Sequence, residues 1–123
     1  MTQTYFWTWL LKQAHRGLGY LVAVLILFLI GWAIYELLTR SSHSDWFDLG
    51  MSGFVGLVDL QVLLGLFLYF LYPAGARPSI EHPSVMILSA AGFHIANKLG
   101  RTGRFVLLIL GALFIGRGIM VVI

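Results

Sequence analysis

Four long apolar blocks, separated by charged or polar turns, constrain this chain more than any other feature. They cover approximately residues 17–38, 50–72, 80–99 and 105–123. A helix needs about 20 apolar residues to cross a bilayer, and the first block, which is free of charge from Gly17 to Tyr35, contains the run LVAVLILFLIGW. The second and fourth blocks each hold one charge, Asp59 and Arg117. The third is the weakest, because its uncharged middle, Pro83 to Asn97, has only 15 residues.

The composition agrees with a membrane location for all four blocks. The chain has 123 residues, of which 59% are hydrophobic and 11% are charged. A soluble domain of this size needs many more polar residues to cover its surface. The turns PAGARPS and NKLGRTGR are short, and short connections make successive helices antiparallel neighbours. The sequence therefore predicts an all-α fold, a single up-down-up-down four-helix transmembrane bundle.

The absence of cysteine limits the chemistry that the chain can perform. It rules out disulfides, Fe–S clusters, covalent CxxCH heme attachment and thiolate metal sites, so any metal chemistry must rest on histidine. The first block is too long and too aromatic for a cleavable signal peptide, and we expect it to stay attached. The net charge is +3, but the Lys and Arg residues lie mostly at span ends, where they meet lipid phosphates and set topology. Nothing supports nucleic-acid binding.

The Lys and Arg residues of the loops divide almost evenly between the two sides. Lys12, Arg16 and Arg77 lie on one side, and Arg40, Lys98, Arg101 and Arg104 lie on the other. The concentration of basic residues in NKLGRTGR favours a cytoplasmic position for the second side. Glu36 and Glu81 lie near span ends, where they can reach water.

Ionisable residues inside a membrane are costly and are functional candidates by default. If successive spans are antiparallel, His15, Arg16 and His82 share a level near one membrane face. Arg117 lies slightly deeper on that side, since it is roughly 9 Å from the C-terminus at 1.5 Å per residue. The predicted constellation is two imidazoles and two guanidiniums at one end of the bundle.

Two imidazoles on facing helices, with cations for two propionates, suit a heme whose iron has histidine on both sides. Gly19 lies one turn beyond His15 on the same helical face, and a flat macrocycle could lie against it. The alternative is that His15 and His82 are interfacial residues that only tune the helix ends.

His94 lies twelve residues after His82, which places it roughly 18 Å deeper and rotates it by about 120°. It comes level with Asp59 and Gln61 on the second block, and a buried Asp59 beside His94 would offset the cost of both groups. Three roles stay open for His94: an interhelical hydrogen bond with Asp59, a proton site, or a cofactor ligand in place of His82.

The segments AHRGLGY, DLQVLLGLFLYF and EHPSVMILSAAGFHI, in this order on three successive spans, resemble the small bacterial four-helix membrane proteins described as cytochrome b-like. They are more distantly similar to one half of heme A synthase. The resemblance covers roughly residues 12–96. It implies a b-type heme between the helix of His15 and that of His82 or His94, with Gln61 and Gly65 as packing residues. It also implies the bacterial inner membrane, but not heme A synthesis, which needs two such bundles in one chain.

The function expected from these observations is that of a heme b subunit that passes electrons within a larger respiratory or photosynthetic complex. One small bundle leaves little room for a substrate site, so an electron-carrying or accessory subunit is favoured over a self-contained enzyme. The expected partners are other membrane subunits, lipid and a quinone. Two alternatives are a heme-free accessory subunit and a proton or small-solute conduit through Asp59, His94 and Gln61.

Overall fold

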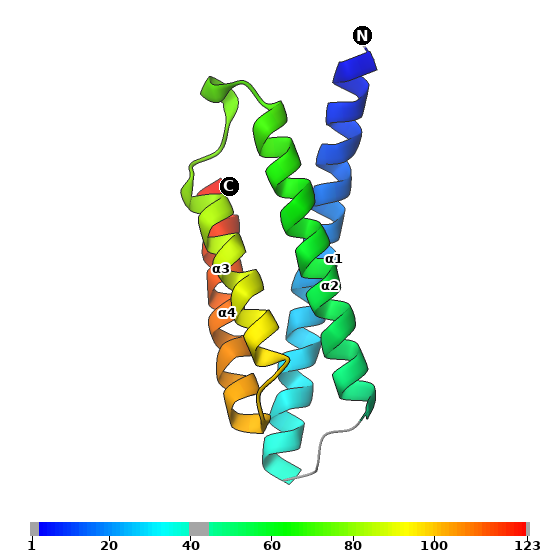
Figure 1. Ribbon diagram of the computed structural model, residues 1–123, viewed down its shortest axis with the longest axis vertical. Coiled ribbons are helices and arrows are strands. Elements are labelled where there is room, and N and C mark those ends of the chain that lie inside the picture. Colours follow the sequence, from blue (N-terminus) through cyan, green and yellow to red (C-terminus); the bar gives the residue numbers. More distant parts are fainter. Residues whose placement is uncertain (1–2, 40–44, 123) are drawn as a thin grey trace.

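The computed structural model describes residues 3–39 and 45–122, and all regular structure within them is helical. The elements are α1 (Gln3–Thr39), α2 (Asp45–Leu71), the short 3₁₀ helix η1 (Ala74–Ala76), α3 (Glu81–Ala96) and α4 (Arg101–Val122) (Figure 1). This confirms the predicted all-α fold. Arg40, one of the residues used to predict topology, lies outside the described residues.

Three of the described helices are long and apolar enough to cross a membrane. The candidate spans are Tyr5–Thr39, Trp46–Leu71 and Arg101–Val122, with mean hydropathies of 2.5, 2.1 and 2.5. The remaining α-helix, α3, has 16 residues and is therefore roughly 24 Å long, which is shorter than a hydrocarbon core of about 30 Å. By contrast, α1 begins well before the predicted Gly17 and is roughly 55 Å long.

The prolines explain where α2 ends and α3 begins. All three prolines of the chain, at positions 73, 78 and 83, lie in or beside the connection between these helices. Pro83 stands in the first turn of α3, where its missing N–H costs no helical hydrogen bond.

Arg77 folds back over the end of α2, and its Nε donates to the carbonyls of Tyr69 and Tyr72 at 2.9 and 3.1 Å. It thereby satisfies acceptors that a helix end leaves free.

The four α-helices pack side by side around a common core. Helix α1 packs against α2 and α4, and α3 packs against α2 and α4, so α1 and α3 occupy opposite corners (Figure 1). Phe54 of α2 and Phe93 of α3 meet edge to face with their ring centroids 4.9 Å apart. Gly111 of α4 lets α3 and α4 approach closely, because a Cβ at this position would collide with the ring of Phe93.

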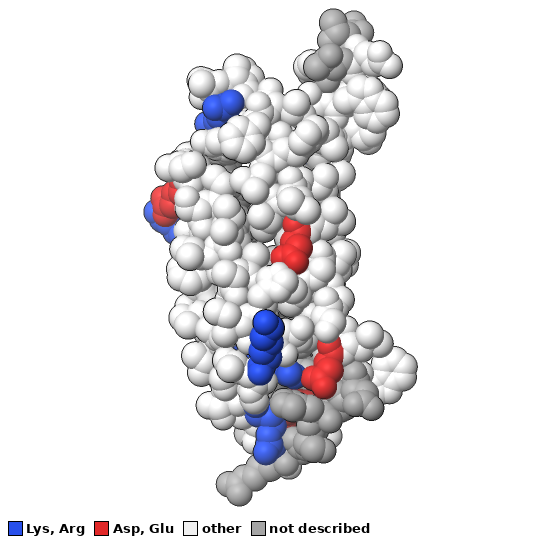
Figure 2. All heavy atoms as spheres, in the orientation of Figure 1, with Lys and Arg blue, Asp and Glu red and all other residues white. Residues whose placement is uncertain are grey.

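The outer surface carries many large apolar side chains. Large side chains such as Leu27, Phe70 and Met120 are more than two-thirds exposed, and a monomeric soluble protein rarely carries so much contiguous apolar surface. On the face shown in Figure 2, charged side chains gather mainly toward the end where α2 and α4 begin. The surface therefore suits lipid or other membrane helices.

Candidate functional site

His15 of α1 is partly buried and is positioned by two residues of α2. The Nε2 of Gln61 donates a hydrogen bond of 2.8 Å to the backbone carbonyl of His15. Gly19 leaves the space for this amide, since a Cβ at Gly19 would lie 3.0 Å from Gln61 Nε2. One turn after Gln61, Gly65 lies against the imidazole, and a Cβ there would lie 2.8 Å from His15 Cε1. These contacts explain why glycine stands at position 19 in HRGLG and at position 65 in QVLLG.

His82 of α3 reaches the same region from the opposite corner of the bundle. Its Nδ1 is 2.7 Å from the carbonyl oxygen of Gly118 on α4. Since a carbonyl can only accept, Nδ1 carries the proton and donates, which leaves the Nε2 lone pair available in the neutral ring. Gly118 is buried, and a Cβ there would lie 2.9 Å from Met86 Cε. The acceptor is therefore fixed by close packing of α3 on α4.

The two imidazoles meet although their helices do not pack against each other. Their ring centroids are 6.5 Å apart and their planes are nearly perpendicular, at 88°. Two buried polar atoms beside this pair, His15 Nδ1 and Gln61 Oε1, have no hydrogen-bond partner. Buried polar atoms in native proteins are nearly always satisfied, so the site has unused capacity for a water or a ligand.

The two predicted arginines lie at this end of the bundle but point to its surface. Arg16 is exposed, and its Nε donates to the hydroxyl of Tyr20 at 3.4 Å. Arg117 is also exposed, and its Nε donates to Glu81 Oε1 at 2.6 Å. The structure therefore brings His15 and His82 together, whereas the two guanidiniums face outward beside them.

His94 and Asp59 form a second polar site on the seam between α3 and α2. His94 Nε2 lies 2.9 and 2.8 Å from the two carboxylate oxygens of Asp59. The structure brings these two predicted partners together, but the pair is not buried in the chain alone, since the side chains are 53% and 43% exposed. Gln61 takes no part in it, because its amide is bound to His15.

Sequence reasoning missed a buried ionic group at the opposite end. Arg104 of α4 is only 3% exposed, its Nη2 lies 3.2 Å from Asp48 Oδ1, and its guanidinium stacks over the ring of Phe47 at 4.8 Å. Glu36 of α1 is 2% exposed, so the expectation that it reaches water is wrong. Arg104 is in helical phase with the buried Leu108, and this phase was the available signal.

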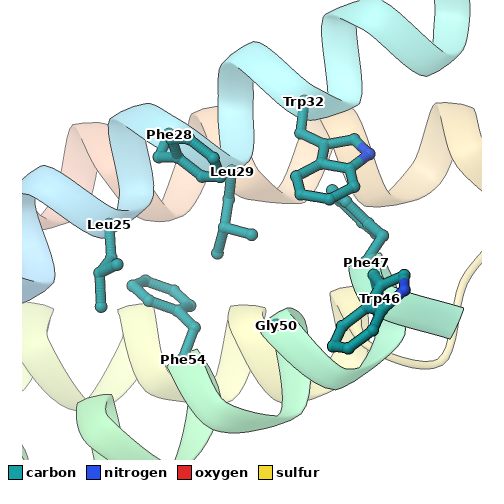
Figure 3. A pocket seen from close by; sticks show the side chains of 8 residues that line it. All are labelled: Leu25, Phe28, Leu29, Trp32, Trp46, Phe47, Gly50 and Phe54. Carbon is teal, nitrogen blue, oxygen red and sulfur yellow. The ribbon is translucent and has the colours of Figure 1, made fainter. Parts of the chain in front are cut away.

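An apolar cavity of about 150 Å³ opens between α1 and α2 (Figure 3). Phe28 and Trp32 of α1 and Trp46 and Phe54 of α2 line it, and Gly50 leaves part of its wall without a side chain. Its described lining residues are apolar apart from the Trp indoles, so it suits a hydrocarbon group.

Comparison of this chain with protein-family models, with curated proteins and with solved structures gives no match. The site itself must therefore carry any functional conclusion. Within residues 3–39 and 45–122, no group of three or more His, Asp or Glu side chains could hold a metal ion. Two imidazoles alone leave a metal short of ligands, so a metal held at His15 and His82 would have to bring further ligands with it.

Proposed function

We propose that the chain is an integral membrane protein of the bacterial inner membrane, an up-down-up-down four-helix bundle that binds heme b between His15 and His82. The observation that carries this proposal is the meeting of these two partly buried imidazoles at one end of the bundle, 6.5 Å apart. At this separation the two imidazoles would both be able to hold one heme iron, as histidine ligands do. A porphyrin also supplies the ligands that the protein lacks.

Several residues beside the pair have defined roles in such a site, whereas the space at Gly19, expected to face the macrocycle, is taken by the Gln61 amide. His15 and His82 would hold the iron, and the Gly118 carbonyl would orient the ring of His82 through its Nδ1–H, in the way that ligating histidines usually use their second nitrogen. Gly65 would set the position of the His15 ring, and Gln61 would fix the backbone of α1 at this level. When bound, the heme supplies one-electron chemistry.

Arg16 and Arg117 stay candidates for the two propionates. Both are exposed at the His15 end of the bundle, and each would exchange its present partner, Tyr20 or Glu81, for a propionate. A guanidinium can bind a carboxylate with two parallel hydrogen bonds. Glu81 would then be released to water.

A one-electron carrier of this size suits a subunit of a larger respiratory or photosynthetic membrane complex. The exposed apolar surface offers contact area for neighbouring subunits, lipid or a quinone. The same surface favours the second candidate function, a heme-free accessory subunit, in which His15 serves only to pack α1 on α2 and His82 only to pack α3 on α4. A conduit through Asp59 and His94 lacks the predicted continuation to Gln61.

An optical spectrum separates the two candidates. The protein is purified after expression with heme supplied, and the reduced spectrum is recorded for the wild type and for the variants His15→Ala, His82→Ala and His94→Ala. Heme b predicts sharp low-spin bands that the first two variants lose and the His94 variant keeps. A colourless wild-type protein would favour the accessory subunit. Loss of heme in His94→Ala, with retention in His82→Ala, would move the ligand to His94.

A further inference from the structure

The Asp59–His94 pair stands at a level where an isolated membrane helix bundle should not carry charge. Asp59 lies at the middle of the apolar span Trp46–Leu71 of α2. Both side chains of the pair are about half exposed on the outside of the bundle. Ionisable groups in membrane helices almost always face a protein interior or a water-filled cavity, so this seam requires a cover that the single chain does not provide.

The hydrogen bonds of the pair leave capacity for a further partner. Only Nε2 of His94 contacts the carboxylate, and Nδ1 has no hydrogen-bond partner among the described residues. An imidazole protonated on both nitrogens donates two hydrogen bonds, and a carboxylate accepts about four. His94 can therefore donate to its own Asp59 and also to a second carboxylate that approaches from outside.

The arrangement of the two charges favours a second copy of the chain as the partner that lies over this seam. Asp59 belongs to α2 and His94 to the neighbouring α3, so the pair lies across the direction of the helices. Two copies can be related by a two-fold axis that runs parallel to the helices just outside this seam. This rotation keeps every residue at its level along the axis and places α2 of one copy opposite α3 of the other. Each carboxylate then lies opposite the other copy's imidazole, so the surface is complementary to itself.

The residues around the pair permit a close approach. Gly56, one turn from Asp59 on α2, is exposed, and no atom lies within 4 Å of the position of its Cβ. Ala91, one turn from His94 on α3, is exposed as well. Small residues at such positions let membrane helices approach closely. Asn97 Nδ2 and Ser52 Oγ, 3.5 Å apart, extend the polar seam toward the start of α2.

We propose that two copies of this chain associate through the α2–α3 seam, with each His94 bridging its own Asp59 and the Asp59 of the other copy. This rests on the membrane placement proposed above but not on heme binding. The two carboxylates and two imidazoles then form a closed ring of hydrogen bonds, which lies between the two copies and away from lipid.

Single cysteines test this directly, because the chain has none of its own. Gly56→Cys places a thiol on the proposed interface. Gly31→Cys, on α1, is the matched control, since it is also an exposed helical glycine with no atom within 4 Å of its Cβ position. Membranes are treated with a short bis-maleimide, and we expect at least tenfold more covalent dimer with Gly56→Cys. Alkaline extraction of the same membranes reports insertion separately, so a soluble chain and a monomeric membrane protein give different results.

Two further variants test the ion pair in the Gly56→Cys background. Asp59→Asn should reduce the dimer to the level of the Gly31→Cys control. The exchange Asp59→His with His94→Asp should restore it, because the two-fold axis still sets a carboxylate opposite an imidazole. A dimer no stronger than the control, a dimer that survives Asp59→Asn, or an exchange that fails to restore it would overturn the proposal.

Discussion

Replacement of Gly65 by alanine tests the heme site most directly, because it adds one methyl group to α2 and alters no ligand. The added Cβ would lie 2.8 Å from His15 Cε1, 3.4 Å from Nε2 and 3.5 Å from Nδ1. The ring must move by roughly 0.7 Å or more to restore an ordinary carbon–carbon separation of about 3.5 Å. Ligand distances in metal sites are held to about 0.2 Å, so a displacement of this size should weaken heme binding.

The expected magnitude follows from two opposing effects. Overpacking of an interior position costs about 1–3 kcal/mol, whereas alanine favours the helix over glycine by about 1 kcal/mol. The overall stability of Gly65→Ala should therefore fall by no more than about 2 kcal/mol. The displacement acts on the heme site itself, and a loss of about 1–2 kcal/mol there weakens heme binding about five- to thirtyfold.

The assay is a titration of heme into the apoprotein in detergent, followed by absorbance, with Gly53→Ala on the same helix as the control. No atom lies within 4 Å of the Cβ position at Gly53, so this control receives the alanine without a collision and should bind heme like the wild type. Equal affinity in Gly65→Ala and Gly53→Ala would refute the placement of the His15 ring beside a heme.

Three further substitutions test other contacts. Arg117→Leu should weaken heme retention during purification more than Arg117→Lys, because a lysine keeps a charge for the propionate but not the paired hydrogen bonds of a guanidinium; equal retention would remove Arg117 from the site. Arg104→Leu should lower the unfolding free energy in detergent by about 1–3 kcal/mol, since it breaks a largely buried ion pair whose carboxylate is partly solvated; an unchanged melting curve would contradict this. Gly111→Ala should destabilise the bundle by about 1–3 kcal/mol through its collision with Phe93, whereas Gly116→Ala, which meets no atom within 4 Å, should not; similar melting temperatures for the two variants would show that α3 and α4 do not pack as described.

The positions of residues along the helices could be predicted from sequence. The rise per residue is constant and the turns between helices are short, so counting residues gives height in the bundle. It placed His15 level with His82, and Asp59 level with His94, and the structure brings each pair together. The apolar blocks likewise identified the helices, because a chain this hydrophobic can satisfy its backbone in lipid only by internal hydrogen bonds.

Only the tertiary structure decided which way each side chain faces. In a soluble helix the polar face reveals this rotation, but the outer surface of this bundle also carries many large apolar side chains, so the pattern carries little directional information. Arg16 and Arg117 were expected beside the histidines and instead face outward, while Glu36, expected near water, is buried. The contacts of Gly65 with His15 and of Gly118 with His82 likewise depend on how the helices are rotated and how closely they pack. Those quantities are set by side-chain interlocking between helices far apart in sequence, and no local pattern in the chain encodes them.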